Sequence, residues 1–377
     1  MPYFISFFVL MFSIFVGSAS AEVALPPDLA VKAYLLKDFN SDQVLAQQQS
    51  KNRVEPASLT KLMTAYLAFK AIKAGQLKLN QTLPISEKAW RIEGSKMFVD
   101  TTMTVTVDEL LHGMIIQSGN DASVALAEGI SGTEDAFATK MNKEAARLGM
   151  KNTHFMNATG LPDDQHYTTA FDLSLLATAL IQDFPDQYKR LYSIKEYTYN
   201  KITQLNRNRL LWLDPYVDGM KTGHTESAGY CLISSAKRGE HRLISVVLGA
   251  ANNNARANES QKLLNYGYQF FDTHLVYKAG AKIATQKVWK GTDNQLVATV
   301  FHDLYVTLPK GEYARAKAKV ISKQPLIAPI AKGQEIGTIQ FFIDGKVIDE
   351  QKLVAAKEVK VAGIFGRLWD SFMLLFA

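Results

Sequence analysis

The sequence contains very little cysteine: Cys231 is the only one in 377 residues. A single cysteine can form neither an internal disulfide nor a cysteine zinc cluster, and its apolar neighbours predict a buried, inert thiol. The seven histidines show no HExxH pattern, so we expect no metal and no cofactor. Despite a net charge of +6, the basic residues form no dense stripe, which argues against a nucleic-acid partner.

Charge is also missing from the N-terminus, because residues 1–21 contain no Lys, Arg, Asp or Glu. Residues 3–16 are almost continuously apolar, and the small residues Ala19, Ser20 and Ala21 follow. This pattern predicts a secretory signal peptide over 1–21, cleaved after Ala21. The usual basic residues before the apolar run are absent, which leaves an uncleaved anchor or a late start as alternatives.

The C-terminus has a different apolar pattern, and residues 359–377 predict an amphipathic helix. One face of this helix would carry Arg367, Asp370, Ser371 and Leu374. The other face would carry Ile364, Phe365, Leu368, Trp369, Phe372, Leu375 and Phe376. The segment is short for a span and is charged, so we expect it to lie in the plane of a membrane surface. The alternative is a terminal helix that docks on the protein's own core.

The chain is long enough for two domains. Strands are expected over 33–37, 217–223, 229–236 and 242–250, with a block of amphipathic helices between the first strand and the others. This order predicts an α+β domain over 22–278, an antiparallel sheet with flanking helices.

A small all-β domain is expected over 279–358. From about Lys282 the sequence shows short apolar runs separated by turn residues. Asp344-Gly345 lies between two such runs and predicts a hairpin. The pattern favours a sandwich.

The strongest chemical motif is Ser58-Leu59-Thr60-Lys61, at the start of a helical pattern that runs from Pro56 to Ile72. Residues at i and i+3 share one helix face, so the Lys61 amine could take the proton of the Ser58 hydroxyl. Lys61 could act as a base only if burial or a second cation lowers its pKa. A second copy of the pattern, Ser234 to Lys237, falls on an expected strand, where the two side chains point to opposite faces.

Two further motifs favour Ser58, in the first copy of the pattern, as the nucleophile. Ser118-Gly119-Asn120 interrupts a helical pattern, and Lys221-Thr222-Gly223 lies on an expected strand. In this order, SxxK, SxN and KTG match the motif set of serine β-lactamases and penicillin-binding proteins. Ser58 would attack a carbonyl carbon, Lys61 would accept its proton, and Ser118 would relay a proton to the leaving amine. The remaining expected contacts are Asn120 with the substrate amide, Lys221 and Thr222 with a carboxylate, and the N–H groups of Ser58 and His224 with an oxyanion.

Longer stretches around these motifs, 56–64, 118–122 and 217–225, resemble the low-molecular-weight penicillin-binding proteins, which are D-alanyl-D-alanine carboxypeptidases. The resemblance extends to the β domain and the C-terminal helix. It implies a β-lactamase/transpeptidase-like catalytic domain and an acyl-enzyme mechanism on peptidoglycan pentapeptide stems. It also implies acylation of Ser58 by penicillins, and a periplasmic location on the outer face of the cytoplasmic membrane.

The resemblance also implies that Arg207 and Arg256 bind the terminal carboxylate of the substrate. The planar guanidinium of arginine can hydrogen-bond both oxygens of a carboxylate. Arg209 is expected to be a solvated surface charge. Relatives often carry a histidine near Thr159, so deacylation could differ here. His154 and His166 are expected to be structural.

Two alternatives remain. The first is a β-lactamase, but class A enzymes use a Glu to activate the deacylating water, and residues 152–169 contain none. The second is a membrane-anchored wall-binding protein without activity, against which the intact motifs argue.

Overall fold

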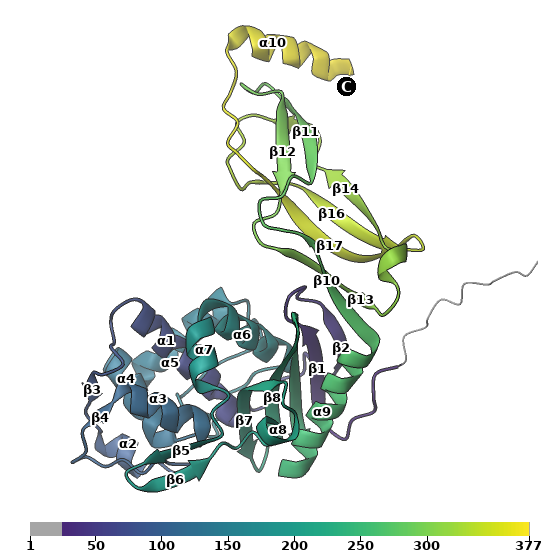
Figure 1. The fold of residues 1–377 in the computed structure, drawn as a ribbon. Helices are drawn as coiled ribbons and strands as arrows, with labels where there is room; N and C mark the ends of the chain where they lie inside the picture. The colour runs from purple at the N-terminus through teal and green to yellow at the C-terminus, as the bar shows by residue number, and fades with distance from the viewer. Residues whose placement is uncertain (1–24, 377) are drawn as a thin grey trace, which may run out of the picture.

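The computed structural model describes residues 25–376. The expected signal peptide, 1–21, lies outside the described residues. A mixed α and β part forms the lower half of the molecule in Figure 1, and a β-rich part rises from it and carries the C-terminal helix.

One antiparallel sheet organises the lower part, and its strand order is β2-β1-β9-β8-β7. The strands are β2 (Val44–Gln48), β1 (Ala33–Asp38), β9 (His241–Ala250), β8 (Gly229–Arg238) and β7 (Val217–Thr225). All four strands expected from the sequence are therefore present. The N-terminal strand β1 pairs with β9, so the two ends of this part of the chain meet inside one sheet.

Both faces of this sheet are buried, because adjacent residues of one strand belong to different cores. Leu35 packs in the core that contains helix α6, whereas Leu36 packs with Leu263 and Leu264 of α9. Strands covered on both faces read as continuous apolar runs rather than as an alternation. This explains why the strands are conspicuous in the sequence.

The larger group of helices covers one face of the sheet, and α9 (Asn253–Phe270) covers the other (Figure 1). The first group comprises α1 (Lys61–Lys73), α2 (Glu87–Arg91), α3 (Val107–Ile116), α4 (Asn120–Ser131), α5 (Glu134–Arg147), α6 (Ala170–Asp183) and α7 (Pro185–Leu191). A short helix, α8 (Leu210–Leu213), and two small two-stranded sheets complete this part. One pairs β3 (Thr82–Leu83) with β4 (Val105–Thr106), and the other is a hairpin of β5 (Glu196–Tyr199) and β6 (Ile202–Leu205).

The start of α1 differs from the expectation that one helix runs from Pro56. Residues Ala57–Thr60 form a 3₁₀ turn, and the α-helix begins only at Lys61. The φ of Ala57, 47°, lies in the left-handed region, so a regular α-helix cannot extend back through this residue to Pro56. Ser58 therefore lies in a tight turn just before the helix.

The β-rich part begins directly after α9, with a strand that the sequence did not reveal. β10 (Phe271–Tyr277) pairs with β13 (Leu304–Pro309) in a sheet of two strands. A second sheet has the order β14-β16-β17-β12-β11-β15. Its strands are β14 (Lys317–Ser322), β16 (Glu335–Ile343), β17 (Lys346–Ala355), β12 (Gln295–Thr299), β11 (Ala284–Trp289) and β15 (Leu326–Ile327). Residues of both sheets share one apolar core, and the expected hairpin at Asp344-Gly345 joins β16 to β17.

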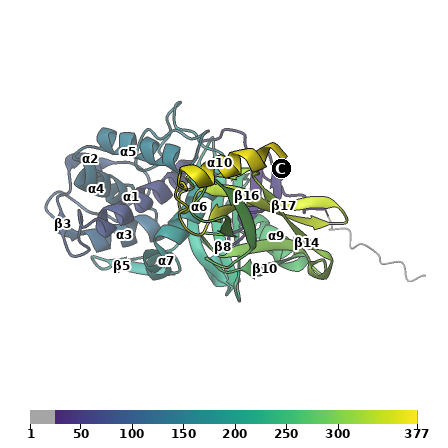
Figure 2. The same ribbon diagram turned by 90° about the horizontal axis from the view of Figure 1, so that it is seen from above.

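Helix α10 (Ile364–Met373) ends the described chain together with a final turn, Leu374–Phe376. It lies at the end of the molecule away from the large sheet, and in the view from above it lies in front of β16 and β17 (Figure 2). Within residues 25–376, no helix combines the length and the apolar character needed to cross a bilayer.

Candidate active site

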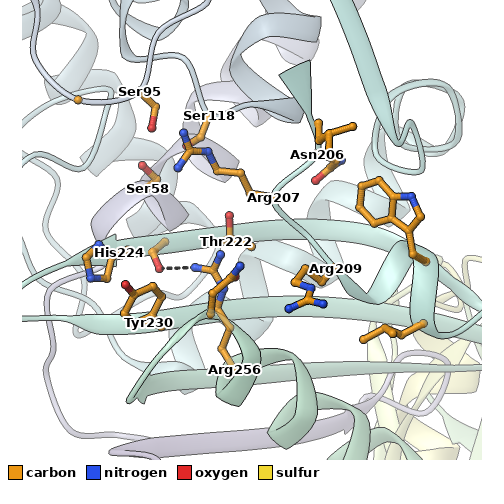
Figure 3. A pocket seen from close by; sticks show the side chains of 16 residues that line it. Ser58, Ser95, Ser118, Asn206, Arg207, Arg209, Thr222, His224, Tyr230 and Arg256 are labelled. Carbon is orange, nitrogen blue, oxygen red and sulfur yellow. Dashed lines mark hydrogen bonds between the residues drawn. The ribbon is translucent and has the colours of Figure 1, made fainter. Parts of the chain in front are cut away.

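A cavity of about 930 Å³ opens beside β7 and contains most of the side chains singled out in the sequence. Figure 3 shows Ser58, Ser118 and Thr222 facing this space from the 3₁₀ turn, the α3–α4 break and the sheet edge. The predicted residues Ser58, Ser118, Arg207, Thr222, Gly223, His224 and Arg256 line the cavity. The side chains of the other three, Lys61, Asn120 and Lys221, are buried and hydrogen-bonded to residues of the site.

Gly223 explains how β7 comes so close to the nucleophile turn. A Cβ built at this glycine would lie 3.1 Å from the carbonyl oxygen of Pro56 and 3.2 Å from the Ala57 Cβ. A larger residue would push the strand away from Ser58. The glycine of the KTG motif therefore allows strand β7 to approach the turn that carries Ser58.

Lys61 lies at the centre of the hydrogen-bond network around Ser58. Its Nζ is 2.8 Å from Ser58 Oγ, and it also donates to Asn120 Oδ1 (2.7 Å) and to the Thr159 carbonyl (2.7 Å). Only 1% of the residue is exposed. Burial, together with the nearby Arg207 charge, lowers the pKa of Lys61 to about 7, although the Asp121 carboxylate opposes this change. A neutral amine, able to accept a proton, is thus accessible near neutral pH.

Lys221 connects the sheet to the second serine of the motif set. Its Nζ donates to Ser118 Oγ at 2.9 Å and to the Thr222 carbonyl at 2.9 Å. Ser118 has a φ of 70°, which turns the chain sharply between α3 and α4. Burial and the nearby cations, Lys61 first among them, hold the pKa of Lys221 well below its usual value.

Two arginines add positive charge at the same wall of the cavity. Arg256, in the first turn of α9, donates from Nη1 to the Gly223 carbonyl at 3.1 Å. Burial lowers its pKa to about 10, with the Arg207 charge contributing. Arg207 donates from Nε to the Gln117 carbonyl at 3.1 Å. Arg209, which was expected to be a solvated surface charge, is exposed but also lines the cavity. With two lysines and three arginines nearby and no Asp or Glu among its described lining residues, the cavity suits an anionic ligand.

Asp121 is a part of the site that sequence reasoning missed. Its buried carboxylate accepts hydrogen bonds from the backbone N–H groups of Met97 (3.0 Å), Phe98 (2.9 Å) and Val99 (3.3 Å). The preceding Asn120 donates from its side chain to the Glu93 carbonyl. These bonds fix the segment that brings Ser95 to the cavity wall. The sequence shows Asp121 beside the SxN motif, but nothing there indicates a contact with residues more than 20 positions away.

The segment from His154 to Thr169 supports the nucleophile turn from behind. Thr64 Oγ1 donates to the Ala158 carbonyl at 2.7 Å, and His166 Nε2 lies 3.0 Å from Thr60 Oγ1. Burial lowers the pKa of His166 to about 4, so this histidine stays neutral near neutral pH. His154 hydrogen-bonds the Gln165 carbonyl within the same segment. Both histidines thus have structural partners.

The second SxxK pattern does not form a comparable site. Ser234 is buried in β8, where its hydroxyl lies 2.6 Å from Ser245 Oγ. Lys237 is partly exposed and lies near Glu240, at 3.6 Å. Cys231, on the same strand, is buried, and burial raises its thiol pKa to about 11.

Comparisons with known proteins agree with this geometry. The family model described as D-alanyl-D-alanine carboxypeptidase matches residues 20–252, and the model for the C-terminal domain of penicillin-binding protein 5 matches 271–361. The chain therefore belongs to the D-alanyl-D-alanine carboxypeptidase family.

Individual relatives cover nearly the whole chain. The D-alanyl-D-alanine carboxypeptidase DacA of Escherichia coli K12 is 43% identical over 358 residues, which cover 93% of this chain and 89% of that protein. The crystal structure of penicillin-binding protein 5 from Haemophilus influenzae matches with a TM-score of 0.85 and 42% identity, covering 89% of this chain and 99% of that one. A shorter relative, penicillin-binding protein D2 of Listeria monocytogenes in its ampicillin-bound form, matches with a TM-score of 0.60 and 32% identity, covering 65% of this chain and 100% of that one.

Proposed function

We propose that this protein removes the terminal D-alanine from peptidoglycan pentapeptide stems through an acyl-enzyme on Ser58, and that penicillins acylate the same oxygen. The observation that carries the proposal is the 2.8 Å contact between Ser58 Oγ and a buried Lys61 amine whose pKa is lowered to about 7. A serine hydroxyl needs such a base beside it to act as a nucleophile.

The reaction begins when Ser58 Oγ attacks the carbonyl carbon of the penultimate D-alanine and its proton passes to Lys61. The N–H groups of Ser58 and His224 stabilise the resulting oxyanion. The C–N bond then breaks, and the departing D-alanine amine takes a proton by way of Ser118. Water hydrolyses the Ser58 ester and frees the shortened stem.

Substrate binding is assigned to the rest of the cavity wall. Asn120 bonds the substrate amide, and the positive edge of β7 and α9 holds the terminal carboxylate. The binding residues in this proposal are Asn120, Arg207, Lys221, Thr222, Gly223, His224 and Arg256. We propose a catalytic domain, a β domain and an anchoring helix over 359–377; the first two meet within 271–278, where β10 follows α9.

Mass spectrometry of the penicillin-treated protein tests this assignment. We expect one adduct, on the peptide that contains Ser58, and release of D-alanine from a synthetic pentapeptide by the untreated protein. An adduct on any other residue, or D-alanine release by a fully labelled protein, contradicts the mechanism.

The pKa of Lys61 predicts how acylation depends on pH. Protonated Lys61 cannot accept the Ser58 proton, and its neutral fraction grows as the pH rises through about 7. The rate constant for acylation by a fluorescent penicillin should therefore rise about tenfold per pH unit below this value and level off above it. The Lys61→Arg variant, whose guanidinium stays protonated, should lack the rise. A profile that is flat in the parent protein contradicts Lys61 as the base.

Membrane attachment through α10 is the second part of the proposal. The apolar side chains of this helix face away from the protein, and Phe365 is 89% exposed. On the polar face, Asp370 contacts the β domain, because the Lys290 backbone N–H donates to its carboxylate. An apolar helix face without a protein partner, next to Lys357 and Lys360, suits the surface of an anionic membrane. Together with the expected signal peptide, this supports a periplasmic enzyme that is peripheral on the cytoplasmic membrane.

Deleting residues 361–377 should free the mature protein from membranes without loss of D-alanine release, because α10 lies at the opposite end of the molecule from β7 and α8, which border the cavity (Figure 1). Co-sedimentation with vesicles that contain phosphatidylglycerol measures the binding. A full-length Phe365→Glu, Phe372→Glu double variant keeps the helix but adds charge to its apolar face, and it should also stay in the supernatant. Sedimentation of both variants with the vesicles would show that the attachment lies elsewhere.

A further inference from the structure

A second cavity lies where the lower part of the molecule meets the β-rich part. Its volume is about 710 Å³, a size common for ligand sites. The lower part contributes the β1–β2 turn and the end of α6, and the β-rich part contributes the β12–β13 loop and residues of β16 and β17. We call this cavity the junction cleft, and the lining residues used below are Asn40, Gln182, Phe301, Asp303, Asp349 and Gln351.

Hydrogen bonds across the junction hold the two walls of the cleft together. Thr273 Oγ1, on β10, donates to the buried Asp38 carboxylate at 2.7 Å. Ser41 Oγ lies 2.6 Å from Thr307 Oγ1 on β13, and the Ser41 backbone N–H donates to Asp38 at 2.7 Å. The β1–β2 turn is therefore fixed to the β-rich part, so the cleft is formed before a ligand binds and little ordering is needed on binding.

Phe301 provides an open aromatic surface in the junction cleft. It lies in the β12–β13 loop and is 60% exposed, although it is one of the lining residues. The end of its ring lies against Gly333, where an added Cβ would be only 2.4 Å from the Phe301 Cζ. A side chain at 333 would push the ring away. The ring is thus held at the cleft with much of its surface left for a ligand.

Polar side chains from both parts of the molecule surround this ring. Within residues 25–376, the Asn40 side chain donates from Nδ2 to the Glu240 carbonyl at 2.8 Å, and the Gln351 side chain donates from Nε2 to Asp349 at 3.2 Å. The amide oxygens of Asn40 and Gln351 can therefore accept hydrogen bonds from a ligand. Gln182 is exposed at the end of α6 and adds an amide that can both donate and accept.

The charge of the cleft decides which kind of ligand it accepts. The described lining residues with charged side chains are Asp42, Asp303, Glu335, Asp349 and Lys352, so carboxylates predominate. Like charges placed against one another cost binding energy, and an anionic polysaccharide or a nucleic acid is therefore disfavoured. Carboxylates remain good acceptors for the hydroxyl groups of a neutral ligand.

We propose that the junction cleft binds a neutral glycan, with one sugar ring packed on Phe301 and its polar groups hydrogen-bonded to the surrounding amides and carboxylates. A sugar ring has apolar C–H faces and hydroxyl groups at its edge, so it needs an aromatic surface beside groups that donate and accept. The glycan meant here is the strand from which the peptide stems extend, and to that extent the inference rests on the proposed function.

The cleft and the Ser58 cavity bind different portions of this polymer. The cleft adjoins the β1–β2 turn and the Ser58 cavity adjoins β7, and β2 and β7 are the opposite edges of the five-stranded sheet. With adjacent strands about 4.8 Å apart, these edges are separated by about 19 Å. A glycan held in the cleft raises the local concentration of its own stems at Ser58, whereas a free pentapeptide gains nothing.

Calorimetric titration of the mature protein with N,N′,N″-triacetylchitotriose tests the cleft without a catalytic step. We expect the parent protein to bind this neutral trisaccharide, and to bind a trisaccharide of uronic acids from alginate much more weakly. Phe301→Ala should raise the Kd for the neutral sugar at least about tenfold, and Gln182→Ala should raise it about threefold. The matched control is Tyr313→Ala, since Tyr313 is an exposed aromatic residue of the same β-rich part that does not line the cleft. It should leave the Kd unchanged.

Release of D-alanine supplies the second readout. Phe301→Ala should lower kcat/KM about threefold or more on uncross-linked glycan strands that carry pentapeptide stems. On the free pentapeptide kcat/KM should stay unchanged, which also shows that the variant is folded. Equal loss on both substrates, equal weakening of sugar binding by Tyr313→Ala, or preference for the uronic acid sugar overturns the inference.

The two measurements separate failure of the cleft from failure of the proposed function. If the parent protein releases D-alanine from the pentapeptide but does not bind the neutral trisaccharide, the cleft inference is wrong and the proposed function stands. If it binds the trisaccharide in a manner that depends on Phe301 but releases no D-alanine, the glycan site is supported and the proposed function is wrong.

Discussion

Replacing Ser58 by alanine should abolish both penicillin labelling and D-alanine release, with a loss of about 10⁴-fold or more in kcat/KM. The hydroxyl oxygen forms the covalent bond in the proposed mechanism, and no neighbouring group can take its place. Water activated by Lys61 would lack both the position and the covalent step. Fluorescence of the labelled protein on a denaturing gel, together with a D-alanine assay, measures the two effects.

The chain offers a matched control in its second SxxK pattern. Ser234→Ala removes the same hydroxyl from the same local pattern, but on a strand where the partner hydroxyl belongs to Ser245. This variant should keep full labelling and activity, with at most a small loss of stability from the unpaired Ser245. Labelling that survives in Ser58→Ala and disappears in Ser234→Ala would reverse the assignment.

The sequence predicted much of the fold because its strongest signals are local. The strands β8 and β9 are largely apolar along their buried middle parts, as expected where helices cover both faces of a sheet. Strand β7 was expected from the run around the KTG motif. The start of α3 is predictable from Thr106 and Glu109, which form a capping box. The side chain of each residue accepts a hydrogen bond from the backbone N–H of the other. The turn at Asp344-Gly345 likewise depends on two adjacent residues with positive φ.

Features that depend on distant contacts were not visible in the sequence. The 3₁₀ turn at Ser58 requires a left-handed Ala57, which no local preference favours. Strand β10 was not predicted, because its partner, β13, follows only after two more strands. The part played by Asp121 depends on backbone groups of 97–99, and the charge on Lys61 depends on burial that only the folded chain creates.

Gly160 shows how closely the nucleophile turn is supported from outside its own helix. It has a φ of 85°, and a Cβ placed on it would lie 1.8 Å from the Ala57 carbonyl oxygen and 2.9 Å from Thr60 Oγ1. Both neighbours flank Ser58, and the first is backbone that cannot rotate away. Any side chain at 160 must therefore displace either this segment or the nucleophile turn itself.

Gly160→Ala should consequently reduce acylation of Ser58 about a hundredfold, since a displacement of about 1 Å in a reacting group has that effect. Gly132→Ala is the matched control: its φ is 80°, but nothing lies within 4 Å of the added Cβ. Both variants carry the backbone cost of roughly 1 kcal/mol for alanine in the left-handed region. Only Gly160→Ala adds a steric clash with the Ala57 carbonyl. This variant should therefore lose more thermal stability than Gly132→Ala, and it alone should lose penicillin labelling. Equal labelling rates in the two variants would mean that contact with residue 160 does not position Ser58.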